Sequence, residues 1–416
     1  MCQREEPHVR NIATVVLLLL TAAVGKTQLS GYASAGYGYH RNPLYNFAMT
    51  PDRLLQGYWQ LDYLTSSTPA DWKIGYVGGL MLFQNLAARN YYEHRVTVGT
   101  TQRFPRGQEN ENDEGTPFRG NTLELGARLA ARHDRTEYRQ FDNWGGEVSG
   151  MYTWGTGTPV SVGVSNETGL RRYTNIPELD NLTSVFDLRL TAGTREGARY
   201  TLFGGAGIKH YMTSDVDTSV FTTVSSSSSS NGQGKGKGLL SGTGNGKKDL
   251  LVNASSVNTL QLHVGVGAAW RWEDGSVQSE FLYRIDPGSS TRVLAQYTNT
   301  TMLSEDLYND FFSHAGPEAK LSFRQQLPLG FSVSFEVLAQ RREYLSPAFS
   351  LDGIVTAARR VDLHGGVEVS LSHALALGEN FGVDVGLVGG FSRNQSNDVY
   401  NDFSGHHYSL TVGMGF

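Results

Sequence analysis

The chain has 416 residues, a net charge of −5 and a mean hydropathy of −0.33. The low hydropathy excludes a bundle of membrane helices, and the mild acidic charge without a basic face argues against a nucleic-acid-binding protein. Gly accounts for 49 residues, Tyr for 20, Phe for 19 and Pro for only 12, a composition typical of an all-β protein.

The first segment is an apolar run over residues 12–24, with Arg4 and Arg10 before it. The run suits the core of a secretion signal and is short for a spanning helix, which needs ~20 residues. Small residues at Ala23 and Gly25 predict a signal peptide over residues 1–25. Cys2 is the one cysteine of the chain, so the mature protein excludes disulfides and thiolate chemistry.

From residue 26 onward, apolar side chains alternate with polar or small ones. Residues 257–272 place Leu260, Leu262 and Val264 on one face and Gln261 and His263 on the other. This period of two is that of a β-strand. Repetition of the pattern predicts about 16 strands, over 28–40, 53–66, 72–84, 92–103, 121–131, 143–154, 158–171, 181–193, 198–212, 257–272, 277–298, 315–325, 331–342, 354–373, 380–393 and 404–416.

Two stretches leave 14 or 18 strands as alternatives. Residues 277–298 contain Asp286-Pro287-Gly288, which is either a bulge or a turn that splits the segment. Residues 104–120 form a long connection where an up-and-down topology asks for a short one.

Three features favour a transmembrane barrel over a soluble sandwich. The predicted strands are long, whereas soluble strands average ~5–6 residues and tilted membrane strands need ~9–11. Aromatic residues gather near strand ends, as in interfacial girdles, and they include Trp59, Trp72, Trp144, Trp154, Trp270 and Trp272. Short connections alternate with long polar ones, 41–52, 132–142, 172–180, 213–256, 299–313, 343–353 and 394–403. We therefore expect a single antiparallel up-and-down transmembrane β-barrel over residues 26–416.

The inner faces of the predicted strands carry charges of both signs, which predicts a charged lumen. The candidate pore-lining residues are Glu124, Arg128, Asp187, Arg189, Lys320, Arg324, Glu336, Arg342, Arg360, Asp362 and Glu368. Such residues would filter solutes by size and charge.

The chain ends on a strand, HHYSLTVGMGF, with Phe416 as its last residue. A sheet in hydrocarbon cannot leave an edge unpaired, so we expect the last strand to meet the first. The ending resembles the C-terminal signature of bacterial outer-membrane β-barrels, the porin-like superfamily, at Tyr408, Leu410, Val412, Met414 and Phe416.

The resemblance implies a bacterial outer-membrane location, contact with outer-membrane lipid, and recognition of the last strand by the barrel-assembly machinery. The Asn-rich stretch that enters the last strand also resembles uncharacterised barrels of the Bacteroidota and Chlorobi lineages, which brings no activity with it. The oligomeric state is left open.

Three other motifs do not identify a function. Residues 225–249 are a Ser-, Gly- and Lys-rich stretch, interpreted as an outer loop or as a loop that folds into the pore. The acidic run 110–115 lacks the Glu that a calcium loop has at its twelfth position, where Asn121 stands. Asp362 and His364 share a strand face, but no serine is singled out as a nucleophile.

The sequence therefore predicts an outer-membrane barrel that is a passive channel for small solutes, without catalytic residues, cofactor, metal or nucleic-acid partner. Three alternatives stay open. They are a barrel that binds a partner or assists export or assembly at the cell surface, an outer-membrane hydrolase, and a soluble β-sandwich.

Overall fold

A computed structural model describes most of the chain from residue 26 to the C-terminus. The described residues are 26–43, 49–67, 70–104, 120–136, 139, 142–156, 158–175, 177–194, 197–212, 250–253, 258–286, 293–296, 311–350, 355–378 and 380–416. The predicted signal peptide, the acidic run 110–115 and the low-complexity stretch 225–249 lie outside these residues.

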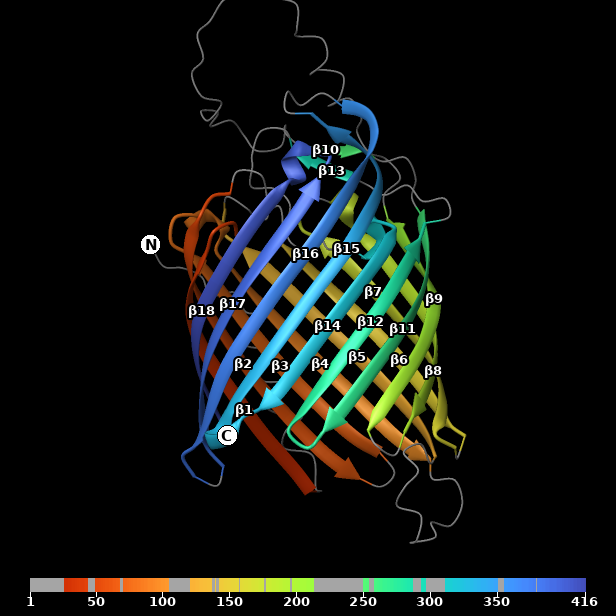
Figure 1. The fold of residues 1–416 in the computed structure, drawn as a ribbon, viewed down its shortest axis with the longest axis vertical. Coiled ribbons are helices and arrows are strands. Elements are labelled where there is room, and N and C mark those ends of the chain that lie inside the picture. Colours follow the sequence, from red (N-terminus) through yellow and green to blue (C-terminus); the bar gives the residue numbers. More distant parts are fainter. Residues whose placement is uncertain are drawn as a thin grey trace, which may run out of the picture.

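Sixteen antiparallel strands close into one barrel (Figure 1). Each strand pairs with its neighbours in chain order, and the last pairs with the first. The barrel strands are β1 (Lys26–His40), β2 (Asp52–Ser67), β3 (Ala70–Phe83), β4 (Tyr91–Phe104), β5 (Asn121–Asp134), β6 (Asn143–Gly155), β7 (Val160–Tyr173), β8 (Asn181–Gly193), β9 (Ala198–Tyr211), β11 (Asn258–Trp272), β12 (Gly275–Ile285), β14 (Gly316–Gln326), β15 (Phe331–Phe349), β16 (Val355–Ala376), β17 (Gly382–Ser396) and β18 (Phe403–Gly415).

The remaining described elements are short and belong to the connections. Two strands, β10 (Leu250–Asn253) and β13 (Val293–Gln296), pair with each other outside the barrel. Single 3₁₀ turns are η1 (Ala87–Arg89), η3 (Pro177–Leu179), η4 (Phe311–Ser313), η5 (Pro328–Gly330) and η6 (Val399–Asn401). The part of the chain that the structure describes holds no helix long and apolar enough to cross a membrane.

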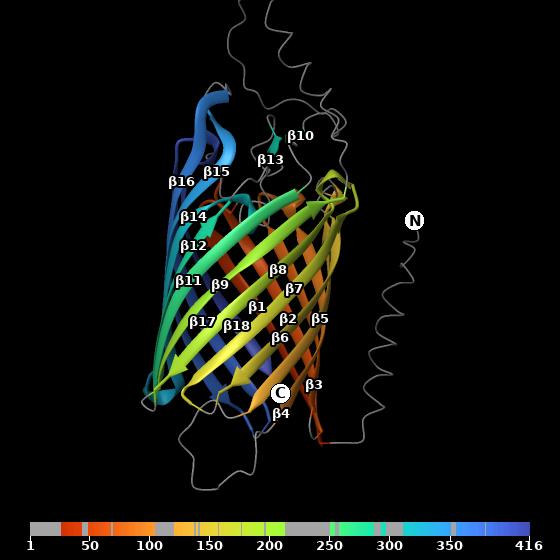
Figure 2. The ribbon, with the colours of Figure 1, turned by 90° about the vertical axis from the view of Figure 1, so that its right-hand side faces the viewer.

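The predicted strand number and topology are confirmed, and two predicted boundaries are wrong. The segment 277–298 is not one strand, because β12 ends at Ile285 and residues 293–296 form β13 outside the barrel. The connection predicted at 343–353 is largely strand, because β15 and β16 keep pairing with each other as far as Phe349 and Val355, beyond a bulge after Glu343. Figures 1 and 2 show this ribbon extending past the neighbouring strands.

The two ends of the barrel differ, because β15 and β16 extend beyond the other strands at one end (Figure 2). We call the end with the C-terminus the base and the opposite end the mouth. Connections at the base are mostly tight, such as that between Trp272 and Gly275. The long connection predicted at 104–120 is present at the base, since β4 ends at Phe104 and β5 begins only at Asn121.

The apolar side chains of the strands point outward. Along β11, side chains from Leu260 to Val266 alternate regularly between exposed outer positions and buried inner ones. On β18 the outer residues Tyr408, Leu410, Val412, Met414 and Phe416 are 46–60% exposed. An apolar outer belt on a closed sheet is the arrangement that lipid requires, so the chain has the architecture of a membrane-spanning β-barrel.

Most of the predicted girdle tryptophans stand at strand ends. Trp72, Trp154 and Trp270 are exposed near the base, and Trp144 is exposed near the mouth. Trp59 departs from the prediction. It lies inside β2, and its indole packs over Gly78 of β3, where a side chain would collide with it.

The seam, the pairing of β1 with β18, uses the last residue of the chain. Gly31 N donates to Phe416 O at 3.0 Å, and Phe416 N donates to Gly31 O at 2.9 Å. The Phe416 ring lies against Gly31, where an added Cβ would sit 2.5 Å from two ring atoms. Closure of the sheet is therefore confirmed, while the role of the final strand as an assembly signal stays a prediction.

We expect Gly31→Val to weaken the seam, because the new side chain displaces the Phe416 ring from the outer face. Gly57→Val is the matched control on the outer face of β2, where the nearest atom to an added Cβ is Leu80 Cβ at 3.7 Å. Heat-modifiability on gels should show a lower unfolding temperature for Gly31→Val alone. Equal midpoints for both variants would contradict this account of the seam.

Candidate functional site in the barrel lumen

A cavity of about 890 Å³ lies in the barrel between the inner faces of β2 to β8. The alternation along each strand determines which residues line the cavity, because the residues between the lipid-facing ones point inward. Both signs of charge line it, through Asp71, Lys73, Arg103, Glu124, Glu167 and Asp187. Three of these side chains form ion pairs: Arg103 contacts Asp71 at 2.7 Å, and Lys73 contacts Asp62, outside the lining, at 3.2 Å. Charged side chains of both signs therefore stand on the wall of the cavity, among apolar ones such as Met151 and Val185.

An acidic row of Glu147, Glu167 and Asp187 crosses the inner wall on three consecutive strands, β6, β7 and β8. Arg128 of β5 forms an ion pair with Glu147 at one end of the row. Glu167 interacts with both Glu147 and Asp187. At the other end His263 of β11 places its Nε2 atom 2.5 Å from Asp187 Oδ1. Arg128 and His263 therefore flank the acidic row at its two ends.

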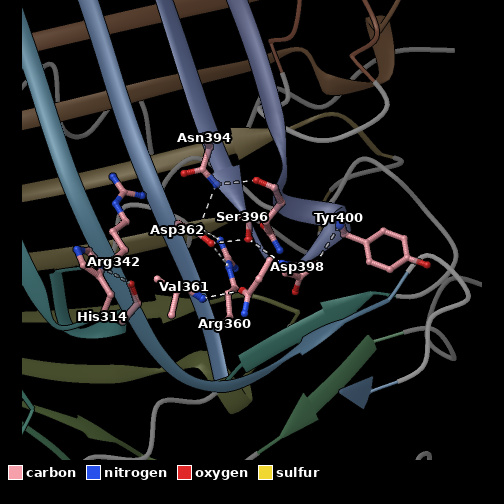
Figure 3. A network of polar contacts seen from close by, with 12 residues as sticks. His314, Arg342, Arg360, Val361, Asp362, Asn394, Ser396, Asp398 and Tyr400 are labelled. Carbon is pink, nitrogen blue, oxygen red and sulfur yellow. Dashed lines mark hydrogen bonds and ion pairs between the residues drawn. The ribbon is translucent and has the colours of Figure 1, made fainter. Parts of the chain in front are cut away.

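A second polar cluster stands at the mouth, and Figure 3 shows it. We call Arg360, Asp362, Asn394, Ser396 and Asp398 the mouth network. Arg360 donates to Asp362 from Nε at 3.0 Å and from Nη2 at 2.5 Å. Asn394 and Ser396 also donate to Asp362, at 3.0 and 2.6 Å. These bonds join β16 to β17 where the two strands leave the membrane belt.

Buried charge in the mouth network is compensated by hydrogen bonds. Asp362 is 0% exposed and Arg360 is 8% exposed, and the Arg360 guanidinium also lies 4.1 Å above the Tyr344 ring. Asp398, in the connection after β17, accepts a hydrogen bond from Tyr400 N at 3.0 Å. Burial raises the pKa of the Asp398 carboxyl above its usual 3.8.

His314 lies at the mouth between β12 and β14 and is also buried. Its Nε2 atom is 3.4 Å from Arg284 Nη1, and Gln261 Nε2 donates to its carbonyl at 2.9 Å. Burial lowers the pKa of His314 well below its usual 6.5. The positive side chains that add to this effect are Arg342, Arg284, Arg360 and, if protonated, His364.

The predicted pore-lining residues fall into several groups. Glu124 and Asp187 line the cavity, and Arg128 pairs with the acidic row. Lys320 and Glu336 form an ion pair of 3.0 Å between β14 and β15. Glu368 faces His407 at 3.4 Å on the wall near the seam.

The other predicted residues lie outside the cavity lining. Arg189 stacks its guanidinium 5.9 Å from the Phe203 ring, and Arg324 stands opposite Ser334 near the base. Arg342 donates to Gln340 Oε1 at 2.7 Å and is 3% exposed. Arg360 and Asp362 belong to the mouth network. A role in solute passage stays a prediction for all eleven residues.

The arrangement around Asp362 does not support the hydrolase alternative. The nearby hydroxyl, Ser396, donates to the carboxylate instead of to a histidine. A triad needs the hydroxyl on the histidine and the carboxylate behind it. The Asp362 carboxylate instead holds the Arg360 guanidinium. Among the described residues, no group of three or more His, Cys, Asp or Glu side chains is placed to hold a metal ion.

Sequence reasoning missed several lumen residues. Glu147 and Glu167 stand at inner positions of correctly predicted strands, so the same alternation could have found them. His263 was placed on the inner face of its strand, but its contact with Asp187 was not predicted. Phe312 and His314 lie in a connection without periodicity, and no sequence signal singles them out.

Comparisons with known proteins bear on the fold alone. No family model matches the chain, and no curated protein matches it. The outer membrane protein OprD from Pseudomonas aeruginosa is 9% identical with a TM-score of 0.44, and 94% of each chain is covered. P. aeruginosa OpdK is 9% identical with a TM-score of 0.45, over 94% of this chain and 99% of that one. Acinetobacter baumannii OccAB3 is 8% identical with a TM-score of 0.44, over 94% and 97%. Neither a solute nor an activity follows from these likenesses.

We expect Asp362→Ala to lower the free energy of unfolding by about 3–5 kcal/mol, because it leaves a buried guanidinium without its carboxylate. Asp402→Ala is the control at the same end of the barrel. It removes an ion pair with Arg393 whose side chains are 36% and 47% exposed, and it should cost below about 1 kcal/mol. Urea unfolding in lipid vesicles measures both. A similar small loss in both variants would show that the mouth network contributes little.

The lowered pKa of His314 predicts a loss of stability in acid. The unfolded chain binds a proton at His314 near pH ~6.5, whereas the folded chain keeps the side chain neutral. Stability is therefore greatest above this pH and falls below it, by up to about 1.4 kcal/mol per pH unit. Unfolding curves between pH 8 and pH 5 should fall less steeply for His314→Gln than for wild type. Parallel curves would mean that His314 titrates normally in the fold.

Proposed function

We propose that this outer-membrane barrel is a passive channel for small solutes. The observation that carries the proposal is the cavity between β2 and β8, whose wall bears both signs of charge. A protein that used its barrel only as a membrane anchor would have no need of charged side chains around an open space, because burying charge is costly.

The mixed charges support a filter of size and charge rather than a site for one tightly bound ligand. Lys73 and Arg103 lie on the same lining as Glu124, Glu167 and Asp187. Ion pairs between neighbouring strands join Lys73 to Asp62 and Arg103 to Asp71 at the cavity wall, where these groups can act on a passing solute. Passage requires binding weak enough for release, and a wall of paired charges is suited to this.

The proposal is tested by conductance in planar bilayers. Folded, purified protein should give discrete conductance steps, and heat-unfolded protein from the same sample should give none. Consistently silent bilayers would reject the channel and would favour the partner-binding or export-assisting alternatives, which need no conducting lumen.

The cavity charges should set the ion preference. The double variant Glu167→Gln with Asp187→Asn removes two negative groups, so the permeability ratio should shift toward anions. Lys73→Gln should shift it toward cations. Each shift should be on the order of twofold, since salt screens charges over ~8 Å at physiological ionic strength. Reversal potentials across a KCl gradient measure both, and shifts in the same direction would contradict the assignment.

A further inference from the structure

One described stretch of a mouth connection reaches into the barrel. Residues 311–315, which we call the strap, precede β14 and include η4. Among the described residues that line the 890 Å³ cavity, Phe312 alone comes from a connection, and the others stand on β2 to β8. Phe312 is 3% exposed. An aromatic side chain from the mouth thus borders the cavity from within the barrel.

The ring of Phe312 fits against a glycine of the wall. A Cβ added to Gly207 of β9 would lie 2.7 and 2.9 Å from two ring carbons of Phe312. Gly207 stands between Val185 and Gln261 in the strand register. Glycine in a strand interior marks a place where another group approaches closely. The wall therefore leaves a gap at Gly207 that the Phe312 ring fills.

Two further contacts hold the strap across the wall. Gln261 of β11, itself 0% exposed, donates to the His314 carbonyl at 2.9 Å. Ala315 and Glu343 of β15 exchange two backbone hydrogen bonds, of 3.0 and 2.9 Å. The strap is thereby tied to β9 and β11 on one side and to β15 on the other. It lies across the strands between them instead of projecting away from the mouth.

We propose that Phe312 is a size-determining residue of the channel, holding the strap down as the boundary of the lumen cavity on its mouth side. The inference rests on the proposed channel function. The phenyl ring takes up space at the edge of the cavity, and its packing against Gly207 fixes the position of the strap backbone. Loss of the ring, or loss of its seat, widens the path past the strap.

The test measures single-channel conductance and sugar permeation for two variants that disrupt the Phe312–Gly207 contact from opposite sides. Phe312→Ala removes the ring, and Gly207→Val fills the seat, so both should raise conductance, on the order of twofold, and admit larger sugars into vesicles. Gly163→Val is the matched control on the inner face of β7, where the nearest atoms to an added Cβ lie 3.8 Å away. The control should conduct as wild type does.

The double variant Gly207→Val with Phe312→Ala adds a check on the contact itself. With the ring gone, the new side chain at position 207 has no ring to displace, so the double variant should match Phe312→Ala and the two effects should not add. Heat-modifiability on gels confirms that each barrel is folded. A silent wild type overturns the channel function and this inference together. A conducting wild type with unchanged Phe312→Ala and Gly207→Val overturns this inference alone.

Discussion

Backbone hydrogen bonding in hydrocarbon is the constraint on which the rest of this molecule depends. Lipid offers no partner for an N–H or C=O group, so a sheet that crosses the membrane must have no free edge. The chain meets this demand at Gly31 and Phe416, which exchange both of their backbone hydrogen bonds. The bare glycine on one side of the seam accommodates the terminal ring on the other. Pairing of the wall therefore continues to the last residue.

Closure turns a simple alternation into two environments. Outer positions such as Leu410 and Val412 face lipid, and the residues between them face the interior. Charges that would be costly on the outer face are collected inside, where neighbouring strands supply partners, as between Arg128 and Glu147. The polar lining of the cavity is thus a consequence of the same pattern that makes the belt apolar. The apolar belt and the charged interior therefore have a common origin in the sequence.

The local pattern made the strands and the topology predictable, because the period of two is visible in a stretch such as 257–272 and closure follows from physics. The start of β16 was predicted, but the continuation of β15 from Glu343 to Phe349 was missed because its pairing goes on past a bulge, where the alternation is interrupted. The contact of Asp187 with His263 joins residues 76 positions apart. It depends on the registers of β8, β9 and β11, which a single strand does not reveal.

Residues of the connections were the least predictable, since neither lipid nor periodicity constrains them. The role of Asp362 illustrates the limit. Its inward direction followed from alternation, but its partners Asn394 and Ser396 come from another strand. Phe312 offered no signal of its own. The complementary glycine at position 207 lies in a stretch with several glycines, so its particular use emerged only with the fold.

The strap has a consequence for how width and stability are related in this barrel. Its contacts with the wall include the packing of Phe312 at Gly207, the hydrogen bond from Gln261 to the His314 carbonyl and the approach of Arg284 to the His314 ring. None of these three belongs to the ladders between adjacent strands that close the cylinder, whereas the Ala315–Glu343 pair continues the register of β14 and β15. Because these three contacts lie outside the ladders, Phe312 and His314 can change without loss of the pairing between the barrel strands. The width of the lumen can therefore change, or evolve, without loss of the strand pairing that keeps the protein in the membrane.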